Sequence, residues 1–463
     1  MTDFSALLQP DKGQPATLLH TIDKSGVEEW LAGQPERVRG AAQAQGFKAE
    51  SGQLAILPGE KADWSALVGV GAAQALSPWC LAKAAEMLPE GAYRLAAGSP
   101  GPATLGWLLG QYRFDRYKSE TTARGARILV TDEPARMGEW ARLAEATALV
   151  RDLVNMPAGE LGPAELEAAV CEVAREQRGA KVTVTAGADL ASGYPMIHAV
   201  GRAADPARAP RLIELVWGDA QHPRVAVVGK GVVFDSGGLD IKPASGMRLM
   251  KKDMGGAAHA LALAMLVMRS RLPIRLHLLI PAVENAISGN AFRPGDVLRS
   301  RKGLTVEIGN TDAEGRLILA DAIARAVEAE PALMLDFATL TGAARVALGP
   351  DLPALFANDD ALAADLLGAG DAAVDPVWRM PLWKGYHELF ASDVADFSNA
   401  SESPFAGAVT AALFLQKFVP ESLPWAHFDT FAWRATAKPG RPKGGEALGL
   451  RAAWGMLKAR YGQ

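Results

Sequence analysis

Apolar runs alternate with helical patterns through the first third of the chain. Short apolar runs bounded by turn residues predict strands at residues 54–57, 66–70, 93–97 and 128–130. Two segments between these runs, residues 78–87 and 102–109, have the apolar spacing of helices. The alternation of the two element types predicts an α/β domain over residues 1–132.

A long helix is predicted to follow this domain. Asp132, Glu133 and Pro134 are residue types that start helices, and small or apolar residues then recur at helical spacing. Pro157 ends the pattern. We therefore expect a linker helix over residues 133–156.

The remaining residues, 157–463, form a second and larger α/β block. Further apolar runs predict strands at residues 182–184, 212–216, 225–228, 274–279 and 333–337. Residues 257–268 predict a buried helix, because nearly every face of it is apolar. The predicted fold class is α/β, with a smaller N-terminal α/β domain joined by a long helix to a larger C-terminal α/β domain with a central mixed sheet.

Composition narrows the functional classes. The chain has 463 residues, and its 48 Lys and Arg against 52 Asp and Glu give a net charge of −4, which argues against a nucleic-acid coat protein. A hydrophobic content of 49% excludes wholesale disorder. The two cysteines, Cys80 and Cys171, supply neither a disulfide framework nor a thiolate zinc site. The first residues lack a signal-peptide pattern and no apolar run reaches about 18 residues, so we expect a cytoplasmic protein without membrane contact.

Charged residues stand directly against apolar runs in the segment 228–258. Lys230 follows a predicted central strand, at the position where open α/β sheets place their ligands. Asp235 precedes a Ser-Gly-Gly turn. Asp253 precedes the apolar helix, where capping of the helix N-terminus is an equally good interpretation.

A second such segment, residues 310–316, reads Asn-Thr-Asp-Ala-Glu-Gly-Arg. Asp312 and Glu314 are two positions apart, so both side chains would point to one side of an extended segment. Arg316 then opens a predicted helix that continues through Val327. Taken alone, the heptapeptide is also compatible with an exposed acidic turn.

The two segments together supply four carboxylates, those of Asp235, Asp253, Asp312 and Glu314. Four negative charges can share one pocket only if cations neutralise them, and two divalent ions carry the matching charge. Carboxylate oxygens with one amine, from Lys230, suit Zn²⁺, Mn²⁺ or Mg²⁺. Two such ions roughly 3.5–4 Å apart can share a hydroxide, which is a nucleophile at neutral pH. Lys242 and Arg316 remain as cations suited to holding an oxyanion or polarising a carbonyl.

Other common catalytic patterns are not found in the sequence. Its seven histidines include no His-Glu-x-x-His pair. Ser236 is not part of a Gly-x-Ser-x-Gly elbow, because Phe234 occupies the first glycine position. No Walker A sequence is present. We interpret His259, one helical turn after Asp253, as a core histidine with satisfied hydrogen bonds rather than a metal ligand.

The charged segments resemble the signatures of a known family. GKGVVFDSGG, IKP, KKDMGGAA and NTDAEGRL are similar to the motifs of the leucyl aminopeptidases of the cytosol aminopeptidase family (M17). Further similarity is found in RDLVNMPAGELGP, DFATLTGAARVALG, SDVADFSN, AGAVTAALFLQKF and WAHFD. The resemblance covers residues 150–463, which would then form a catalytic dimetal aminopeptidase domain. The domain before it would serve oligomerisation and access.

The resemblance implies a role for each charged residue. The more tightly bound metal would be held by Lys230, Asp235, Asp253 and Glu314. The more exchangeable metal would be held by Asp235, Asp312 and Glu314. Lys242 would polarise the scissile carbonyl, and Arg316 would hold a bicarbonate ion that acts as general base for the bridging water.

The resemblance also implies the substrate, the assembly and the side-chain pocket. Family members are hexamers that release N-terminal residues from short peptides, and a free α-amino group that binds one metal would select exopeptidase cleavage. Met250, Thr339 and Gly342 match pocket positions of the family. The stretch after WAHFD departs from it, with Phe431 and Trp433 where many members have small residues. The resemblance therefore predicts aminopeptidase chemistry. It leaves open whether leucine is the preferred N-terminal residue.

Two alternatives use the same residues differently. A two-metal phosphoester hydrolase would need similar carboxylates, although we would then expect more histidine ligands and a phosphate-binding arginine cluster. A non-catalytic or DNA-binding hexameric scaffold of the same fold would not need Lys242 and Arg316. We expect no nucleic-acid partner, because the net charge of −4 gives DNA binding no support.

Overall fold

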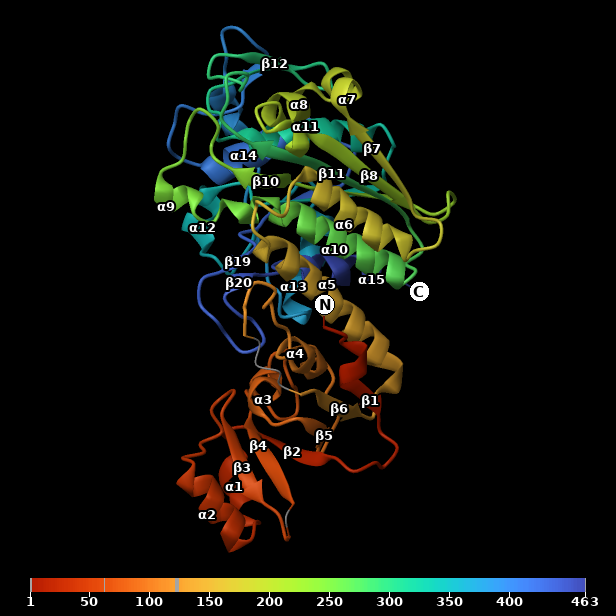
Figure 1. The fold of residues 1–463 in the computed structure, drawn as a ribbon, viewed down its shortest axis with the longest axis vertical. Helices are drawn as coiled ribbons and strands as arrows, with labels where there is room; N and C mark the ends of the chain where they lie inside the picture. Colours follow the sequence, from red (N-terminus) through yellow and green to blue (C-terminus); the bar gives the residue numbers. More distant parts are fainter. Residues whose placement is uncertain (1, 62, 121–124, 463) are drawn as a thin grey trace. The chain divides into compact units, whose positions relative to one another are not determined.

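The computed structural model describes residues 2–61, 63–120 and 125–462 and divides into two compact units (Figure 1). The first consists of Met1–Ala148 and Ala435–Lys443, and the second of Leu149–Arg434 and Gly444–Gln463. Helix α5 (Met137–Asn155), preceded by the short helix η2 (Pro134–Arg136), runs through the division. No pattern in the sequence indicated that residues 435–443 belong with the N-terminal unit.

The first unit is a six-stranded sheet with helices, as the alternating pattern predicts. Its strand order is β1-β6-β5-β2-β4-β3, and only the β3–β4 pair is antiparallel. The strands are β1 (Leu8–Pro10), β2 (Thr17–Ile22), β3 (Leu54–Pro58), β4 (Trp64–Gly69), β5 (Gly91–Leu95) and β6 (Arg127–Thr131). The helices are η1 (Ser5–Leu7), α1 (Val27–Ala32), α2 (Glu36–Ala44), α3 (Ala82–Met87) and α4 (Ala103–Leu109).

The second unit is built on a nine-stranded mixed sheet. Its path is β16-β15-β18-β14-β9-β11-β8-β7, and β10 pairs with β11 in addition. The strands are β7 (Lys181–Ala186), β8 (Arg211–Trp217), β9 (Arg224–Gly229), β10 (Gly231–Asp235), β11 (Arg275–Asn285), β14 (Leu333–Ala338), β15 (Ala354–Ala357), β16 (Trp378–Arg379) and β18 (Trp425–Asp429). In the centre, β18, β14, β9 and β11 form consecutive parallel pairs. The predicted fold class is therefore confirmed.

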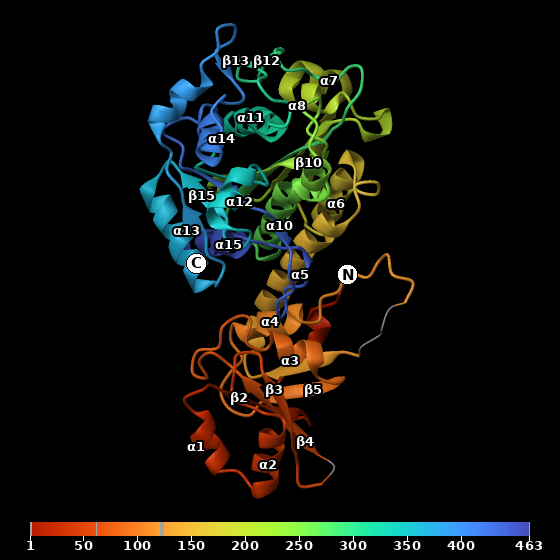
Figure 2. The same cartoon turned by 90° about the vertical axis from the view of Figure 1, so that its left-hand side faces the viewer.

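Two smaller sheets and the helices complete this unit (Figure 2). The small sheets join β12 (Val297–Arg299), β13 (Thr305–Glu307) and β17 (Phe397–Ser398), and β19 (Trp433–Arg434) with β20 (Gly444–Gly445). The longer helices are α6 (Pro163–Arg175), α10 (Gly255–Arg269), α11 (Glu314–Val327), α13 (Asp360–Ala372), α14 (Gly407–Gln416) and α15 (Leu450–Tyr461). The short ones are α7 (Gly187–Gly193), α8 (Pro195–Gly201), η3 (Pro206–Arg208), α9 (Ala244–Met247), η4 (Met250–Met254), α12 (Gly342–Leu348) and η5 (Lys384–Phe390).

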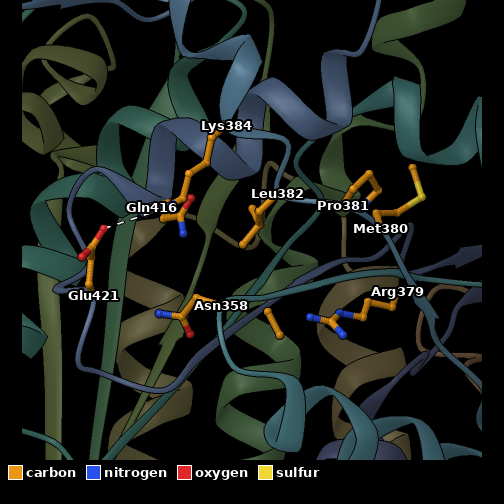
Figure 3. A pocket seen from close by; sticks show the side chains of 9 residues that line it. Asn358, Arg379, Met380, Pro381, Leu382, Lys384, Gln416 and Glu421 are labelled. Carbon is orange, nitrogen blue, oxygen red and sulfur yellow. Dashed lines mark ion pairs between the residues drawn. The ribbon is translucent and has the colours of Figure 1, made fainter.

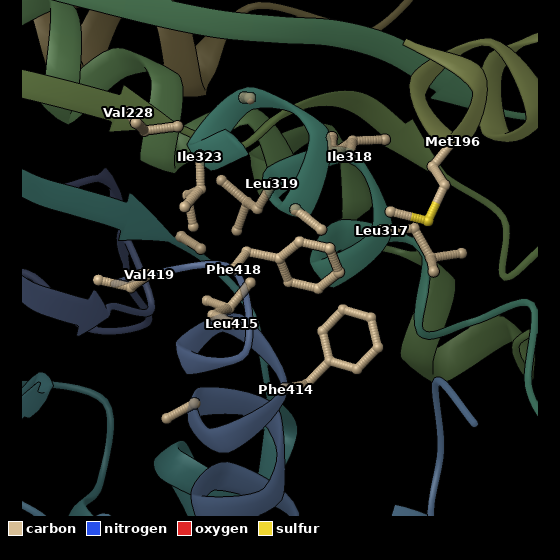
Figure 4. Close-up of a cluster of buried hydrophobic side chains, with 14 of the residues drawn as sticks. Met196, Val228, Leu317, Ile318, Leu319, Ile323, Phe414, Leu415, Phe418 and Val419 are labelled. Carbon is tan, nitrogen blue, oxygen red and sulfur yellow. The ribbon is translucent and has the colours of Figure 1, made fainter. Parts of the chain in front are cut away.

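Helices α10 and α11 are packed against opposite faces of the central sheet. Ala226 and Val228 of β9 belong to the apolar cluster that contains α11 and α14, whereas their neighbours Val225 and Val227 point to the other face, where α10 lies. Figure 4 shows Leu319 of α11 and Leu415 of α14 among the buried apolar side chains of this cluster. Helices α10 and α11 are thus fixed to the sheet by fully buried side chains.

Among the described helices, none is both long enough and apolar enough to cross a membrane.

Candidate metal centre

The carboxyl ends of four central strands meet at one edge of the sheet. Lys230 follows β9 and donates its backbone N–H to Phe337 O of β14 over 2.9 Å. Asp235 ends β10 and Asn285 ends β11, the strand beside it. Strand β10 was not predicted, because the glycine and lysine before it interrupt the apolar run.

The entrance of α10 brings Asp253 to this edge. A Cβ on Gly256 would lie 2.1 Å from Phe337 O, so only glycine allows the helix to start this close to β14. The hydroxyl of Thr339 lies 2.7 Å from Asp253 Oδ1. Asp253 does not cap the helix: Met254 is the N-cap residue and no side chain bonds to the helix end. The capping interpretation was therefore wrong, and the side chain of Asp253 faces the strand ends instead.

Asp312 lies in a turn and Glu314 lies at the start of a helix, so neither residue belongs to an extended segment. Residues 311–312 form a turn, and Glu314 is the first residue of α11. The expectation of an extended segment was wrong, because backbone and side-chain hydrogen bonds fold it into a turn. Asp312 N–H, for example, donates to Asn310 Oδ1 over 2.7 Å. Helix α11 also begins two residues before the predicted start at Arg316.

Two lysines separate the four carboxylates into pairs. The Nζ of Lys230 lies 2.6 Å from Asp253 Oδ2 and 3.0 Å from Glu314 Oε1. The Nζ of Lys242 lies 2.8 Å from Asp235 Oδ2 and is also in contact with Asp312. One oxygen from each of Asp235, Asp312 and Glu314 falls within 4.8 Å of the others. The structure therefore brings together all six of these residues, which the sequence singled out.

The lysines of the cluster do not keep all four carboxyl groups at their ordinary pKa, although a third lysine, Lys252, lies 3.4 Å from Asp253 Oδ1. Burial, and then the neighbouring carboxylate of Asp235, raise the pKa of Glu314 to about 8 and that of Asp312 to about 6. Burial alone would lower the pKa of Lys230, but Asp253 and Glu314 raise it well above its usual value. The pKa of Lys242 is raised in the same way, by Asp235 against the effect of burial.

The donor set fits divalent cations. Asp253 Oδ2, Asp312 Oδ1 and Glu314 Oε1 are buried and meet lysine ammonium groups, whereas Glu314 Oε2 is buried and has no donor among the described residues. Buried acceptors without donors are rare in proteins unless an ion or a water meets them. Hard carboxylate oxygens in this number are typical ligands of Zn²⁺, Mn²⁺ or Mg²⁺.

Arg316 lies two residues into α11 and is largely buried. Its Nη1 donates to Asn399 O over 2.7 Å, and its guanidinium lies 5.9 Å from the ring centre of Phe414. Burial lowers the pKa of Arg316 to about 10, so the side chain is still a cation at neutral pH. Its Nε makes no hydrogen bond among the described residues, which leaves a donor for an anion.

Two of the four predicted pocket residues lie beside Asp253. Met250 begins the η4 turn that carries Asp253, and Thr339 contacts it directly. Gly342 starts α12 and is exposed, with no atom within 4 Å of the position that a Cβ would take. Phe431 is half-buried between two cations, with Lys252 Nζ at 5.4 Å and Arg345 Cζ at 4.7 Å from its ring centre.

Sequence reasoning missed the neutral side chains that hold the charged ones. Asn285 donates to Asp235 Oδ1 over 2.9 Å and to Thr311 O over 3.2 Å. Sequence reasoning also missed the carboxylate of Asp240, which accepts from the N–H of Thr311 over 2.7 Å. A polar residue at the carboxyl end of an apolar strand was the available signal for Asn285; the sequence offered no comparable signal for Asp240.

His259 is a core histidine, as expected. It is fully buried, its Nδ1 lies 2.7 Å from Gly255 O, and its Nε2 accepts from Leu448 N–H over 3.0 Å. With both ring nitrogens satisfied in the neutral form, the side chain has no lone pair left for a metal.

A pocket of about 720 Å³ lies at the other edge of the sheet and takes no part in this centre (Figure 3). Asn358, one of its lining residues, follows β15, which runs antiparallel to β18 so that Ala357 pairs with Ala426 near the start of β18. Lys230 and Thr339 lie at the opposite ends of the parallel strands.

The fold and the site together define a two-domain α/β protein with a carboxylate and lysine centre suited to divalent cations. The model of the "Cytosol aminopeptidase family, catalytic domain" matches residues 148–453, and that of the "M17 aminopeptidase, N-terminal domain" matches residues 17–131. The chain belongs to the cytosol aminopeptidase family. Membership supports aminopeptidase activity and implies divalent metal ions.

Individual relatives agree with this placement. A probable cytosol aminopeptidase of Roseiflexus castenholzii is 42% identical over 368 residues, which are 75% of this chain and 74% of that protein. The crystal structure of cytosol aminopeptidase from Coxiella burnetii is similar with a TM-score of 0.93 at 45% identity and covers 98% of this chain and 99% of that one. The bottromycin maturation enzyme BotP, solved in complex with Mn, has a TM-score of 0.86 at 35% identity and covers 96% and 99%.

Replacement of the central carboxylate tests whether the cluster holds metal. Glu314→Ala removes two buried acceptor oxygens that lie between the lysine-paired groups, so we expect the variant to retain neither of two divalent ions after dialysis. Metal content per chain is measured by elemental analysis. The control is Glu328→Ala, which removes an exposed carboxylate that pairs with Arg301 just after the other end of the same helix. Two ions per chain in Glu314→Ala would contradict a shared ligand at this position.

Metal binding should release protons. Because burial and Asp235 raise the pKa of Glu314 to about 8, its carboxyl is mostly protonated at pH 7 and must lose this proton to bind a cation. Lys230 must lose a second proton to act as a ligand, because its pKa is raised as well, so we expect the affinity for Mn²⁺ to rise by up to about 100-fold per pH unit between pH 6 and 8. Calorimetry in two buffers of different ionisation enthalpy counts the protons. Equal heats in both buffers and an affinity independent of pH would contradict this expectation.

Proposed function

We propose that this protein is a two-metal aminopeptidase that removes N-terminal residues from short peptides. The observation that carries the proposal is the convergence of four carboxylates and two lysines from three separate segments at one edge of the sheet. Lys230, Asp235, Asp253, Asp312 and Glu314 would hold the ions. When bound, a pair of divalent ions supplies a nucleophilic water at neutral pH and polarises the scissile carbonyl.

Lys242 is suited to stabilise negative charge that develops on the substrate carbonyl oxygen. Its ammonium lies between Asp235 and Asp312, and its side chain is more exposed than that of Lys230, at 14% against 3%. A fixed cation in a partly buried site acts more strongly on the transition state than on the neutral ground state.

Arg316 is suited to hold a small anion beside the carboxylates. Its guanidinium is fixed by Asn399 O and the ring of Phe414, and its Nε is available. The resemblance of this segment to the family implies that the anion is bicarbonate and that it accepts the proton of the attacking water. This role requires Arg316 to stay protonated, which its pKa of about 10 allows.

The proposal includes the metal, the assembly and the location, which the relatives and the family resemblance support. Mn²⁺ is a candidate because the related enzyme BotP was solved with Mn, and Zn²⁺ or Mg²⁺ would suit the same oxygens. The family resemblance supports a homo-hexamer that acts in the cytoplasm. Met250, Thr339, Gly342 and Phe431 would line the pocket for the released side chain, with Phe431 narrowing it relative to members that carry small residues there.

The role of Lys242 predicts a large loss of turnover in Lys242→Ala. Loss of one group that stabilises an oxyanion typically lowers kcat by about 10²–10³-fold, and we expect a value in this range at saturating metal. The matched control is Lys302→Ala, which removes a lysine whose Nζ donates to Lys417 O outside the cluster. Near-normal turnover in a Lys242→Ala protein that holds both ions would remove this residue from the mechanism.

A panel of aminoacyl-anilides tests the proposed function as a whole. We expect chelation to abolish hydrolysis and added Mn²⁺ or Zn²⁺ to restore it, because the carboxylates alone supply no nucleophile. Release is followed by absorbance for each side chain, and phosphate monoesters and diesters are assayed in parallel. Metal-dependent phosphoester hydrolysis without anilide release would favour a phosphoesterase, and no metal-dependent hydrolysis of either kind would favour a scaffold.

A further inference from the structure

Asn399 is a buried asparagine whose side chain hydrogen-bonds to the backbone of the turn before α11. It follows β17 and has no exposed surface. Its Oδ1 accepts from the N–H groups of Gly309 and Asn310 over 2.8 and 3.2 Å. Its Nδ2 donates to Asn310 O over 2.8 Å and to Ala313 O over 3.4 Å. One amide thus satisfies four backbone groups of residues 309–313.

The turn needs these bonds because its backbone belongs to no helix or strand. Residues 308–313 are irregular, yet several of them are buried or half-buried, so their peptide groups require partners other than a regular ladder. An asparagine side chain offers two N–H donors and two acceptor lone pairs, and Asn399 uses all four. An apolar residue at position 399 would take this partner from the N–H groups of Gly309 and Asn310 and from the carbonyl of Ala313.

The asparagine is itself held in place by a rigid support. Its own N–H donates to Glu307 O over 2.8 Å and extends the pairing of β17 with β13. Phe397, two residues earlier, packs edge-on against Phe414 and Phe418, with ring centres 5.4 and 6.2 Å apart. The small sheet therefore fixes the backbone of Asn399, and the side chain of Asn399 fixes the turn.

The turn controls the position of three groups of the metal centre. It contains Asp312, it ends one residue before Glu314, and the backbone oxygen of Asn399 accepts from Arg316 Nη1 over 2.7 Å. We propose that Asn399 is a positioning residue of the metal centre, whose side chain fixes the 309–313 turn so that Asp312 and Glu314 face Asp235. The proposal rests on the proposed two-metal function and assigns no contact of Asn399 with metal or substrate.

A purely structural role would affect stability alone, and Asn358 provides the matched comparison. Its side chain also bridges backbone groups, with Oδ1 accepting from Trp425 N–H over 2.8 Å and Nδ2 donating to Leu423 O over 2.9 Å. It lies at the opposite edge of the sheet, beside the pocket of Figure 3. Asn358→Ala therefore removes hydrogen bonds of the same kind from the same unit without touching the turn.

The experiment compares Mn²⁺ binding by calorimetry in the full-length wild type, Asn399→Ala and Asn358→Ala, each well below its Tm. We expect both variants to have a lower Tm, because both leave backbone groups unpaired. We expect Asn399→Ala to weaken at least one Mn²⁺ equivalent by about 10–100-fold, as is typical when an outer support of a metal site is lost. Asn358→Ala should bind Mn²⁺ within about twofold of the wild type.

The outcomes separate this inference from the proposed function. Wild-type affinity for both equivalents in folded Asn399→Ala, or an equal loss in Asn358→Ala, would overturn the positioning role while the two-metal function stands. A wild type that binds no Mn²⁺, Zn²⁺ or Mg²⁺ would overturn both. If Asn399→Ala does not fold, the same criteria apply to Asn399→Gln compared with Asn358→Gln, which keep a neutral amide and displace it by one methylene group.

Discussion

Mutual repulsion among four clustered carboxylates is the constraint on which this structure depends; those of Asp235, Asp253 and Glu314 are buried and that of Asp312 is half-buried. Lys230 and Lys242 each lie between two of them and Lys252 lies beside Asp253, yet burial and the neighbouring carboxylate of Asp235 still raise the pKa values of Glu314 and Asp312. Such a cluster is unfavourable in a protein interior unless cations complete it. Bound cations would offset the repulsion among the carboxylates, so the cluster has the properties of a cation-binding site. This agrees with membership of the cytosol aminopeptidase family, which implies divalent metal ions.

The scaffold keeps the carboxylates in place by fixing where two helices begin. Asp253 lies two residues before the start of α10 and Glu314 is the first residue of α11, so both carboxylates are close to the positive end of a helix dipole. The two helices cover opposite faces of the sheet and are buried along nearly their whole length. A Cβ on Gly315 would lie 2.5 Å from Lys230 Cε, so the start of α11 is also packed tightly against the lysine at the strand end.

Much of this could be predicted from the sequence because the relevant signals are local. The apolar strand before Lys230 and the apolar helix after Asp253 both identify charged residues at the border of a core. The local geometry of Asp312 and Glu314 could not be predicted, since the turn that carries them is held by Asn399, which is more than eighty residues away. Strand β10 was missed because the glycine and lysine before it interrupt the apolar run, and its pairing with β11 joins residues about fifty positions apart. Long-range hydrogen bonds decide both features.

Lys230 and Lys242 differ in their surroundings, and the difference suits Lys230 to hold the carboxylates and Lys242 to act on a substrate. Lys230 is enclosed by Asp253, Glu314 and the carbonyl of Thr339, which lies 3.2 Å from its Nζ, so no face of its ammonium is directed to a substrate. Lys242 lies in the irregular segment between β10 and α9 and keeps part of its side chain exposed. Its backbone N–H donates to Ser236 O over 3.0 Å, which closes this loop beside Asp235. A cation that is anchored at its backbone and held by two carboxylates keeps a fixed position, so it can act on a substrate oxygen with little reorganisation, and this is the property that stabilisation of a transition state requires.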